Sequence, residues 1–464
     1  MEGSTIALTM SPPLPPGPSL PSFFQTALWV RRPTEFMQYC RRKYGPTFTV
    51  RLPPRAIVFY SEPAAIKQIF AARGDEMHAG EFNQVLGPVV GKSSVLLLDE
   101  GEHMRQRKLL LPAFHGERMR VYASAMQSIA ASDLATWQAG VPFSLHPHMQ
   151  AVTLDIILRT VFGADEGNQF EELRGALKKL LSRGELPVSV PILSFLSARP
   201  ERETTLPWRW LLADRDRADA LIYAQIAARR ADPGAKGRTD VLAMLLEARD
   251  ADGEPMTDSE LRDELVTALA AGHETTATAL CWAFERILST PRVHERLVQE
   301  IDSASTDGVP RLEQVVRLEY LDAVLRETLR LRPIIPLVGR VLTEPATIGG
   351  VALDRGTAVA ACIYLAHRNP DSYRDPDEFL PERFLGVKED PNAWLPFGGG
   401  IRRCLGAAFA FYEMKIVTAT VLAAMKLSLA QTPPARIVRR AITFSPEHGT
   451  RVVAEPRVAL RASA

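Results

Sequence analysis

The sequence contains little cysteine, no long apolar run and almost no net charge. Its 464 residues include four cysteines and no Cys-x-x-Cys pair, which argues against a zinc ribbon, a dithiol redox site and a secreted disulfide scaffold. The apolar patch at residues 23–30 is far shorter than the ~20 residues that span a bilayer, and no basic stretch precedes it. We therefore expect a cytoplasmic protein without a transmembrane anchor.

Charge is nearly balanced, with 55 Lys and Arg residues against 54 Asp and Glu residues. Such a chain has no global attraction for nucleic acid, so a partner must be attracted by a local patch. Hydrophobic residues make up 46% of the sequence, which supplies material for a large core. Residues 1–20 are proline-rich and predict an extended N-terminal arm, whereas residues 21–464 show no linker and predict a single domain.

The spacing of apolar residues predicts a mainly α fold with small β-sheets. Strand-like runs occur at 48–52 and 56–60, helical periodicity dominates from about 100 to 332, and short strands and turns follow Pro333. Three glycines at 398–400 then lead into a final apolar helix, which we expect over 405–430.

One predicted helix is long enough to cross the whole molecule. It begins at a possible capping box formed by Thr257 and Glu260, continues to about Leu288 and ends before Pro291. At about 1.5 Å per residue it is roughly 46 Å long. Gly272 makes its centre weak, because a glycine inside a helix costs about 1 kcal/mol, and a local opening there would free backbone groups.

The strongest local signal is the segment FGGGIRRCLG at residues 397–406. Its glycines allow a tight loop that lets the backbone approach a flat ligand. Cys404 lies just before a helix, where free N–H groups and the helix dipole favour a thiolate, and Arg402 and Arg403 add positive charge. The alternative is a structural cysteine in a glycine turn. The segment is neither a dinucleotide-binding G-x-G-x-x-G loop nor a phosphate-binding Walker A loop.

This segment matches F-x-x-G-x-R-x-C-x-G and resembles the heme-binding loop of the cytochrome P450 family. The resemblance covers the chain from about Leu14 to its C-terminus and implies the cytochrome P450 fold, with the long central helix over the heme. It implies heme b (iron protoporphyrin IX) as cofactor, with Cys404 as the iron ligand that favours O–O cleavage. By the same resemblance Phe397 covers the thiolate, Arg402 reaches a heme propionate, and Gly406 completes the motif.

The centre of the long helix reads AGHETT at residues 271–276 and resembles the family's A-G-x-[D/E]-T-T stretch. The resemblance implies that Thr275 holds a hydrogen bond to dioxygen and that Glu274 helps to relay protons. A hydroxyl beside a carboxylate is a plausible proton relay. The alternative for Thr275 is a hydrogen bond to the carbonyl four residues earlier.

Two further motifs resemble supporting parts of the family's heme site. Glu327 and Arg330 match its E-x-x-R motif on a face that is expected to be buried, and Arg383 supplies a third member of a structural triad. Buried ions of this kind need each other as partners. Propionate carboxylates need cations, which the resemblance assigns to His103, Arg107 and Arg340. Solvated surface charges are the alternative for these three.

The resemblance also implies which segments line the substrate pocket. These are residues near 83–98, 186–198, 264–272, 334–338 and 443–446. The side chains there are mainly apolar, as in most buried ligand sites. The candidates are Val90, Leu97, Leu269, Ala271, Ile334, Ile335, Leu337 and Phe444. Residues 206–212 are a candidate access lid, although their two tryptophans also fit a core.

The resemblance implies a monooxygenase that inserts one atom of O2 into a lipophilic small molecule such as a fatty acid, terpenoid or polyketide. Alternatives are a peroxide-dependent hydroxylase or isomerase, which the Glu274–Thr275 pair disfavours, and a heme sensor or carrier. Electrons are expected from ferredoxin and ferredoxin reductase, or flavodoxin, with NAD(P)H, and the protein is expected to be a monomer. A basic docking patch is predicted from Arg105, Lys108, Arg118 and Arg120, with mixed surface charge as the alternative.

Overall fold

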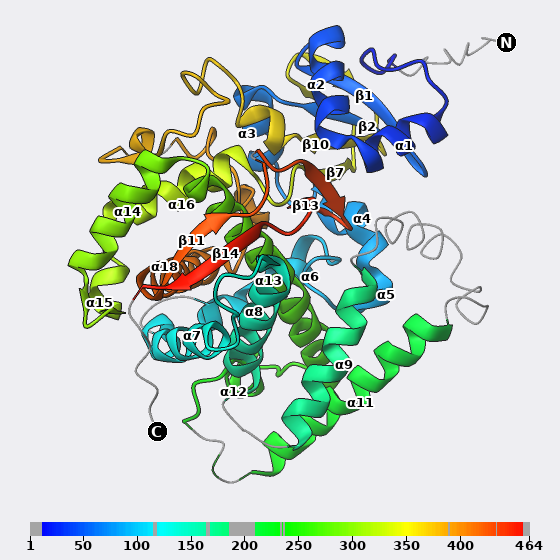
Figure 1. The fold of residues 1–464 in the computed structure, drawn as a ribbon. Helices are drawn as coiled ribbons and strands as arrows, with labels where there is room; N and C mark the ends of the chain where they lie inside the picture. The colour runs from blue at the N-terminus through cyan, green and yellow to red at the C-terminus, as the bar shows by residue number, and fades with distance from the viewer. Residues whose placement is uncertain are drawn as a thin grey trace, which may run out of the picture.

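The computed structural model describes residues 12–114, 118–163, 168–184, 209–232, 234, 237–387, 390–432 and 434–457. Helices form most of the molecule and the strands gather into small sheets, which confirms the predicted fold class (Figure 1). The helices are α1 (Ser22–Arg31), α2 (Pro33–Tyr44), α3 (Pro63–Ala71), α4 (Ala79–Asn83), α5 (Gly87–Val90), α6 (Glu100–Leu110), α7 (Arg118–Leu134), α8 (Leu145–Phe162), α9 (Asn168–Gly184), α11 (Arg209–Ala231), α12 (Val241–Glu247), α13 (Asp258–Leu288), α14 (Pro291–Ser303), α15 (Leu312–Val315), α16 (Glu319–Leu331), α17 (Ile363–Ala366) and α18 (Ala407–Ala424).

The largest sheet among the described residues has five strands in the order β1-β2-β10-β7-β3. Its strands β2 and β10 are parallel, with Ile57 opposite Ala358, and the other pairs are antiparallel. The strands are β1 (Thr47–Leu52), β2 (Arg55–Tyr60), β3 (Met77–His78), β4 (Phe143–Ser144), β5 (Ser305–Thr306), β6 (Val309–Pro310), β7 (Val338–Leu342), β8 (Ala346–Ile348), β9 (Val351–Leu353), β10 (Ala358–Ala361), β11 (Met425–Leu429), β12 (Ile437–Arg440), β13 (Thr443–Pro446) and β14 (Arg451–Pro456).

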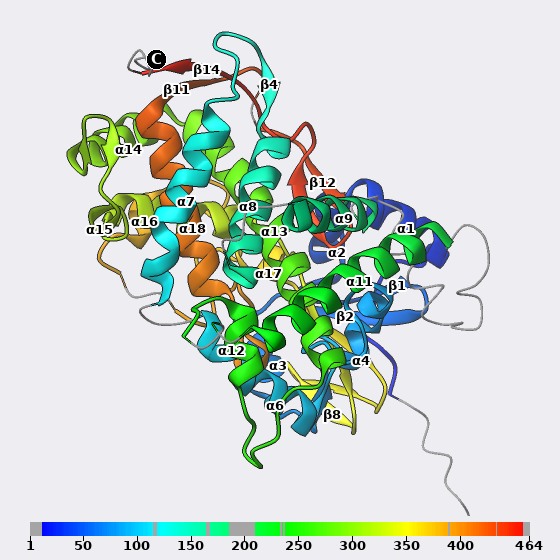
Figure 2. The ribbon, with the colours of Figure 1, turned by 90° about the horizontal axis from the view of Figure 1, so that it is seen from below.

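Helix α13 runs through the helical part of the molecule, where it packs against α8, α16 and α18 (Figure 2). Both hydrogen bonds of the predicted capping box, between Thr257 and Glu260, are present. The helix is continuous through Gly272, so the structure shows no opening at its centre. A Cβ at Gly272 would lie 3.2 Å from Ile157 Cδ1 of α8, so this glycine allows the two helices to approach closely.

The C-terminal helix is shorter than the sequence predicted. Helix α18 ends at Ala424, and Met425–Leu429 form strand β11, which pairs with β14. The prediction to residue 430 was wrong because the apolar run continues from helix into strand, and pairing with a distant strand decides the conformation. Among the described helices, α18 alone is long and apolar enough to cross a membrane, but most of it is buried inside the protein.

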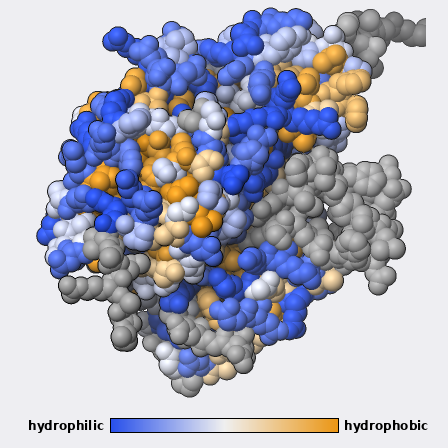
Figure 3. Space-filling view, viewed as in Figure 1, coloured by the Kyte–Doolittle hydropathy of each residue, from blue (hydrophilic) through white to orange (hydrophobic). Residues whose placement is uncertain are grey.

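The N-terminal segment lies against the five-stranded sheet. Residues 12–20 form no helix or strand, and the Thr49 backbone N–H and hydroxyl of β1 donate to the carbonyls of Pro16 and Pro15 at 3.0 and 2.7 Å. Orange atoms gather over this part of the molecule in Figure 3, where Phe23 and Phe24 of α1 are 74% and 55% exposed.

Candidate functional site

The cysteine loop, residues 397–406, folds back on itself just before α18. The Cys404 N–H donates to the Phe397 carbonyl at 3.0 Å, which closes the loop. Gly398 and Gly400 adopt φ values of 67° and 64°, a backbone conformation that residues other than glycine rarely adopt. A Cβ at Gly400 would lie 1.9 Å from the Phe70 carbonyl oxygen of α3. The glycines therefore serve a tight turn and a close approach between two protein segments.

Cys404 differs from the other three cysteines, because its side chain has exposed surface while Cys40, Cys281 and Cys362 are buried. Protein atoms still surround its thiol, and burial raises the pKa of Cys404 above its usual value. The Gly406 N–H, Arg403 and Arg107 act in the opposite direction. The expected thiolate-stabilising groups are thus present, but burial outweighs them, so the loop by itself does not ionise the thiol.

Four basic side chains converge beside the cysteine loop. The Arg107 guanidinium of α6 donates to the Arg403 carbonyl at 2.9 Å. Burial lowers the pKa of His103 to about 3, and the charges of Arg402, Arg107 and Arg340 lower it further. Burial also lowers the pKa of Arg340 and of Arg402 to about 10 each, and of these two cations only Arg402 has an ion pair among the described residues.

Asp99 is a member of this site that sequence reasoning missed. Its carboxylate accepts from Arg402 Nη2 at 2.5 Å and from the Gly80 N–H at 2.8 Å. The residue directly precedes α6, where an Asp is expected to cap the helix, but no such cap bond is present. The position of Asp99 before a helix suggests a helix cap, whereas in the structure Asp99 binds Arg402 and the Gly80 N–H.

Beyond its exposed first turn, α13 has accessible residues at its centre. Ala271 is exposed and Thr275 is partly exposed, although the turns on both sides of them are buried. The Thr275 hydroxyl donates to the Ala271 carbonyl at 2.6 Å, the local bond that was the alternative reading of this residue. Glu274 points instead toward α8, where Gln150 Nε2 donates to it at 2.8 Å and His146 Nε2 lies 3.1 Å away.

Known proteins resemble this chain over nearly its whole length. The sequence model of the family Cytochrome P450 matches residues 15–450. The chain belongs to the cytochrome P450 family. It is 42% identical over 445 residues to cytochrome P450 135B1 of Mycobacterium tuberculosis, covering 96% of this chain and 92% of the relative. It is 39% identical to cytochrome P450 135A1 of the same organism, covering 96% of both chains.

Two solved structures share the fold of this cytochrome P450. One is the retinoic acid-bound cyanobacterial CYP120A1, with a TM-score of 0.82 and 26% identity, covering 96% of this chain and 100% of the other. The other is the heme domain of cytochrome P450DA, with a TM-score of 0.84 and 24% identity, covering 97% and 99%. Membership of the family makes the protein a monooxygenase with heme b as its cofactor.

The residues around Cys404 fit heme b. The buried His103 Nδ1 finds no hydrogen-bond partner within the described ranges. Arg340, 7% exposed, donates to its neighbour's carbonyl at Gly339. Buried cations and an orphaned ring nitrogen call for anionic acceptors, and the two propionates of heme supply such groups. A thiol beside this cationic cluster matches the donor set that a heme thiolate protein needs.

The predicted triad is brought together in the structure. Arg330 Nε donates to Glu327 at 2.6 Å and Arg383 Nε donates to the same carboxylate at 3.0 Å. Both Glu327 and Arg330 have side chains that are 0% exposed. Arg330 also donates to the carbonyls of Pro376 and Glu378, so the triad fixes the segment that leads toward the cysteine loop.

His367 adds a connection that sequence reasoning missed. Its Nε2 accepts from the Leu395 N–H at 2.8 Å, and its Nδ1 lies 2.9 Å from the Arg330 carbonyl. Because Nε2 accepts from an N–H, the ring is neutral with its proton on Nδ1. Burial lowers the pKa of His367 to about 3, which keeps it in that form. It thereby links α16 to the start of the cysteine loop.

The predicted pocket residues fall into two groups. Ala271 is exposed, and Ile335 and Leu337 are partly exposed, whereas Val90, Leu97, Leu269, Ile334 and Phe444 are buried. The Phe444 N–H donates to the Ile334 carbonyl at 2.8 Å, which joins two of the predicted segments. Leu269 lies on a different face of α13 from Ala271 and Thr275, since six residues along a helix turn by about 240°.

Residues 91–99, here called the strap, connect α13 with the cysteine loop. On one side, the Ser93 and Val95 N–H groups each donate at 2.8 Å to Asp263 and Glu264, respectively. On the other side, Arg402 donates to the Val95 carbonyl at 3.1 Å. The strap carries the pocket candidate Leu97, so α13 and the cysteine loop together position that side chain.

Two other predictions meet the structure only in part. Arg105 is not available for docking, because its guanidinium lies 2.6 Å from Asp250 and 2.5 Å from Glu260, which compensate its charge. Lys108 is exposed as expected, but the side chains of Arg118 and Arg120 lie outside the described part. Pocket residues 186–198 and lid residues 206–208 are also outside it, and Arg209–Leu212 begin α11.

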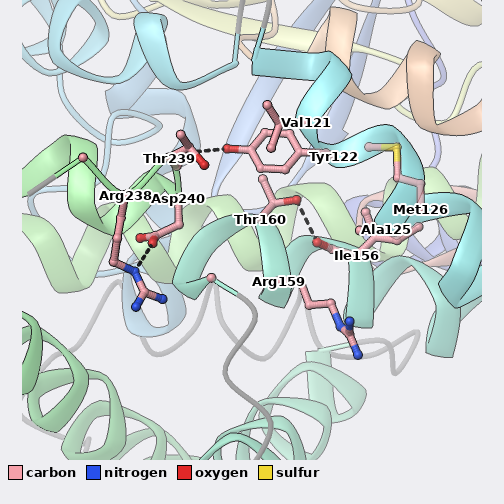
Figure 4. Close-up of a pocket in the computed structure, with 12 residues that line it drawn as sticks. Val121, Tyr122, Ala125, Met126, Ile156, Arg159, Thr160, Arg238, Thr239 and Asp240 are labelled. Carbon is pink, nitrogen blue, oxygen red and sulfur yellow. Dashed lines mark hydrogen bonds and ion pairs between the residues drawn. The ribbon is translucent and has the colours of Figure 1, made fainter. Parts of the chain in front are cut away.

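A separate cavity of about 300 Å³ lies between α7, α8 and residues 237–240 (Figure 4). Its lining includes Met126, Ile156, Arg159 and Asp240, and no predicted site residue. Arg238 donates to Asp240 at 3.1 Å beside it. The cavity lacks Cys404 and the cationic cluster, so we do not assign the oxidation chemistry to it.

Proposed function

We propose that this cytochrome P450 inserts one atom of O2 into a lipophilic small molecule, such as a fatty acid, terpenoid or polyketide-like compound. The observation that carries this proposal is the Glu274–Thr275 pair at the accessible centre of α13, in a chain whose Cys404 loop fits heme. A carboxylate and a hydroxyl at such a place suit the proton supply that reductive O–O cleavage requires.

In this proposal each site residue has a defined task. Cys404 is the iron ligand, and bound heme supplies the activation of O2. The propionates are held by His103, Arg107, Arg340 and Arg402. Phe397 covers the thiolate, and its carbonyl accepts from the Cys404 N–H at 3.0 Å, while Gly406 is the N-cap of α18 two residues after the ligand.

Thr275 and Glu274 have complementary hydrogen-bonding properties. The Thr275 hydroxyl donates its proton to the Ala271 carbonyl, so the lone pairs of its oxygen are free to accept a proton donor in the site. Burial works to raise the pKa of Glu274, but hydrogen bonds from His146 and Gln150 outweigh it and lower that pKa. Glu274 is therefore ionised at neutral pH and able to take up a proton.

An apolar substrate agrees with the chemistry of the pocket candidates. Ala271, Ile335 and Leu337 have accessible surface, Leu97 is a buried residue of the strap, and Val90 is buried just before it. The structurally similar CYP120A1 was solved with retinoic acid, a lipophilic carboxylic acid. We therefore choose retinoic acid as the first compound for spectral titration of the ferric heme, followed by fatty acids and terpenoids.

Electrons are proposed to come from ferredoxin with its reductase, or flavodoxin, and NAD(P)H, and the protein is proposed to act as a cytoplasmic monomer. Exposed Lys108 follows Arg107, which touches the cysteine loop, so a partner that contacts Lys108 would be close to the heme ligand. All four cysteines are free, as is usual in a reducing compartment.

The proposal is tested by supplying ferredoxin, its reductase and NADPH to the holoprotein with compounds that shift its heme spectrum. We expect oxygen consumption together with a product that contains one added oxygen atom derived from O2. Turnover with peroxide alone would instead indicate a peroxide-dependent enzyme. Binding of ligands without any turnover would indicate a sensor or carrier.

A further inference from the structure

The carboxylate of Glu274 lies in a hydrogen-bond network that reaches toward the protein surface. His146 Nε2 of α8 is 3.1 Å from Glu274 Oε1, and Thr278 Oγ1 donates to the same oxygen at 3.0 Å. Gln150 Nε2 donates to Oε2 at 2.8 Å. On its other side, His146 Nδ1 is 3.2 Å from Arg440 Nη1 of β12. The five side chains come from α8, α13 and β12, three elements that are far apart in sequence.

The chemistry of arginine fixes the direction of these hydrogen bonds. A guanidinium can only donate, so His146 Nδ1 accepts from Arg440 and the ring proton is on Nε2. The Nε2–H then donates to the Glu274 carboxylate. His146 is thus held with an acceptor nitrogen toward Arg440 and a donor nitrogen toward the proposed proton-relay acid.

The other groups that face Glu274 do not exchange protons readily near neutral pH. Burial lowers the pKa of His273 to about 4, and its Nδ1 is 3.1 Å from the Thr153 hydroxyl. Burial raises the pKa of Cys281 well above its usual value. Gln150 and Thr278 carry no ionisable group, and a guanidinium offers only hydrogen-bond donors. The imidazole of His146 is the side chain in this set with one nitrogen that accepts and one that donates, so it can pass a proton from one ring nitrogen to the other.

The network also has a short path to solvent. His146 is in the first turn of α8 and has 4% side-chain exposure, but Pro147 beside it is exposed. Arg440 is partly exposed on β12. His146 Nδ1 therefore lies behind a partly exposed guanidinium, while Glu274 has 15% side-chain exposure at the accessible centre of α13.

We propose that His146 passes protons from solvent to Glu274, with Arg440 as the group that covers its outer nitrogen. In this step His146 Nδ1 binds a proton from a hydronium ion, which leaves as water, while Nε2–H transfers its proton to the Glu274 carboxylate. The imidazole stays neutral and changes tautomer, and Glu274 becomes a carboxylic acid. The inference rests on the proposed function, because it requires that Glu274 supplies protons to oxygen chemistry at the heme.

The tautomer is tested first, without turnover. Ring ¹⁵N NMR of the holoprotein as its diamagnetic ferrous carbon monoxide adduct is recorded at neutral pH, with His146 assigned by its loss in His146→Gln. We expect a protonated Nε2, an unprotonated Nδ1, and a shift of both signals in Glu274→Gln. A doubly protonated ring would overturn the proposal, because His146 would then be a fixed cation. Signals that do not respond to Glu274→Gln would also overturn it.

The relay itself is tested with His146→Gln, whose amide can donate to Glu274 and accept from Arg440 but cannot shuttle a proton. The matched control is His148→Gln, since His148 lies two residues away and pairs with Asp133 at 3.1 Å. Oxygen consumption driven by ferredoxin, its reductase and NADPH is compared in H2O and D2O. We expect at least a roughly tenfold loss in rate and a larger solvent isotope effect for His146→Gln alone.

The outcomes separate this proposal from the proposed function. Unchanged rate and isotope effect in His146→Gln would overturn the relay and leave the monooxygenase proposal standing. Equal losses in His146→Gln and His148→Gln would also overturn it, because they would reflect α8 in general. If the wild-type protein consumes no oxygen, the proposed function fails, and the NMR experiment still decides whether His146 and Glu274 are coupled as described.

Discussion

Glu264 of α13 is a buried carboxyl group without a cation beside its free oxygen. Its Oε1 accepts from the Val95 N–H of the strap, and its Oε2 has no partner among the residues that the structure describes. Burial raises the pKa of Glu264 to about 8, and the nearby charges of Asp263 and Glu260 act in the same direction. At neutral pH this group is therefore mostly protonated, and the strap is held by a neutral acid.

The protonated Glu264 carboxyl group predicts that the folded protein becomes less stable as pH rises. The folded protein holds the Glu264 proton up to about pH 8, whereas an unfolded chain releases it near the ordinary value of 4.5. Stability from this proton is fully present below about pH 4.5, falls as pH rises from there, and is gone above about pH 8. Between pH 6.5 and 9 the wild type should therefore lose about 2 kcal/mol more unfolding free energy than Glu264→Gln, because each pH unit below 8 is worth about 1.4 kcal/mol. Denaturant unfolding of both holoproteins measures this, and equal losses would contradict it.

At the scale of single residues, the sequence predicted only those site residues that belong to short motifs. Cys404, Glu274, Thr275 and the E-x-x-R pair stand in patterns of a few neighbouring positions. His146 is 128 positions from Glu274, and Asp99 is 303 positions from Arg402. No local pattern marks such residues, because their roles exist only once the fold brings the partners together.

Helix α16 carries an ion cluster in which the Glu327 and Arg330 side chains are completely buried and Arg383 is 14% exposed. Glu327 accepts from Arg330, from Arg383 and from the Leu380 N–H at 2.9 Å, so its carboxylate is fully used. Removing one partner of a buried ion pair typically costs about 3–5 kcal/mol, because the remaining charge is left without compensation. The cluster therefore contributes to the fold around the cysteine loop and needs no catalytic role.

We predict that Glu327→Ala lowers the free energy of unfolding by about 3–5 kcal/mol and reduces heme retention. The control is Arg374→Ala, because the Arg374 side chain is 94% exposed and its ion pair with Asp375 is at the surface. That variant should stay within about 0.5 kcal/mol of the wild type. Equal stability of the two variants in denaturant unfolding would disprove the importance of the cluster.

At the scale of elements, the sequence was most informative where local signals mark both ends. The boundaries of α13 were predicted almost to the residue because a capping box begins it and Pro291 follows it. The end of α18 was missed because strand β11 continues the same apolar run. The parallel pairing of β2 with β10 joins Ile57 to Ala358, and no nearby residues encode that contact.

At the scale of the whole molecule, the surface charge bears on where an electron-donor protein docks. The net charge of +1 gives no overall attraction, so docking must depend on a local patch. Arg105 is compensated by Asp250 and Glu260, which leaves exposed Lys108 as the described member of the predicted patch. Its neighbour Arg107 contacts the cysteine loop, so this surface is close to the proposed iron ligand.

We predict that Lys108→Glu slows reduction of the heme by an acidic ferredoxin about fivefold to tenfold at low salt, with little effect at high salt. Stopped-flow reduction under carbon monoxide measures the rate. Glu102→Gln, a charge change at another exposed position of α6, is the control and should not slow the reaction. A rate for Lys108→Glu that equals the wild type at low salt would remove this surface from the account.

The central claim is that Cys404 holds the heme iron as a thiolate. It is tested most directly by the absorption spectrum of the ferrous carbon monoxide adduct of wild type and Cys404→Ala, each reconstituted with heme. We expect the red-shifted Soret band of a thiolate-ligated heme in the wild type and its complete loss in Cys404→Ala. Persistence of that band in Cys404→Ala would show that Cys404 is not the iron ligand.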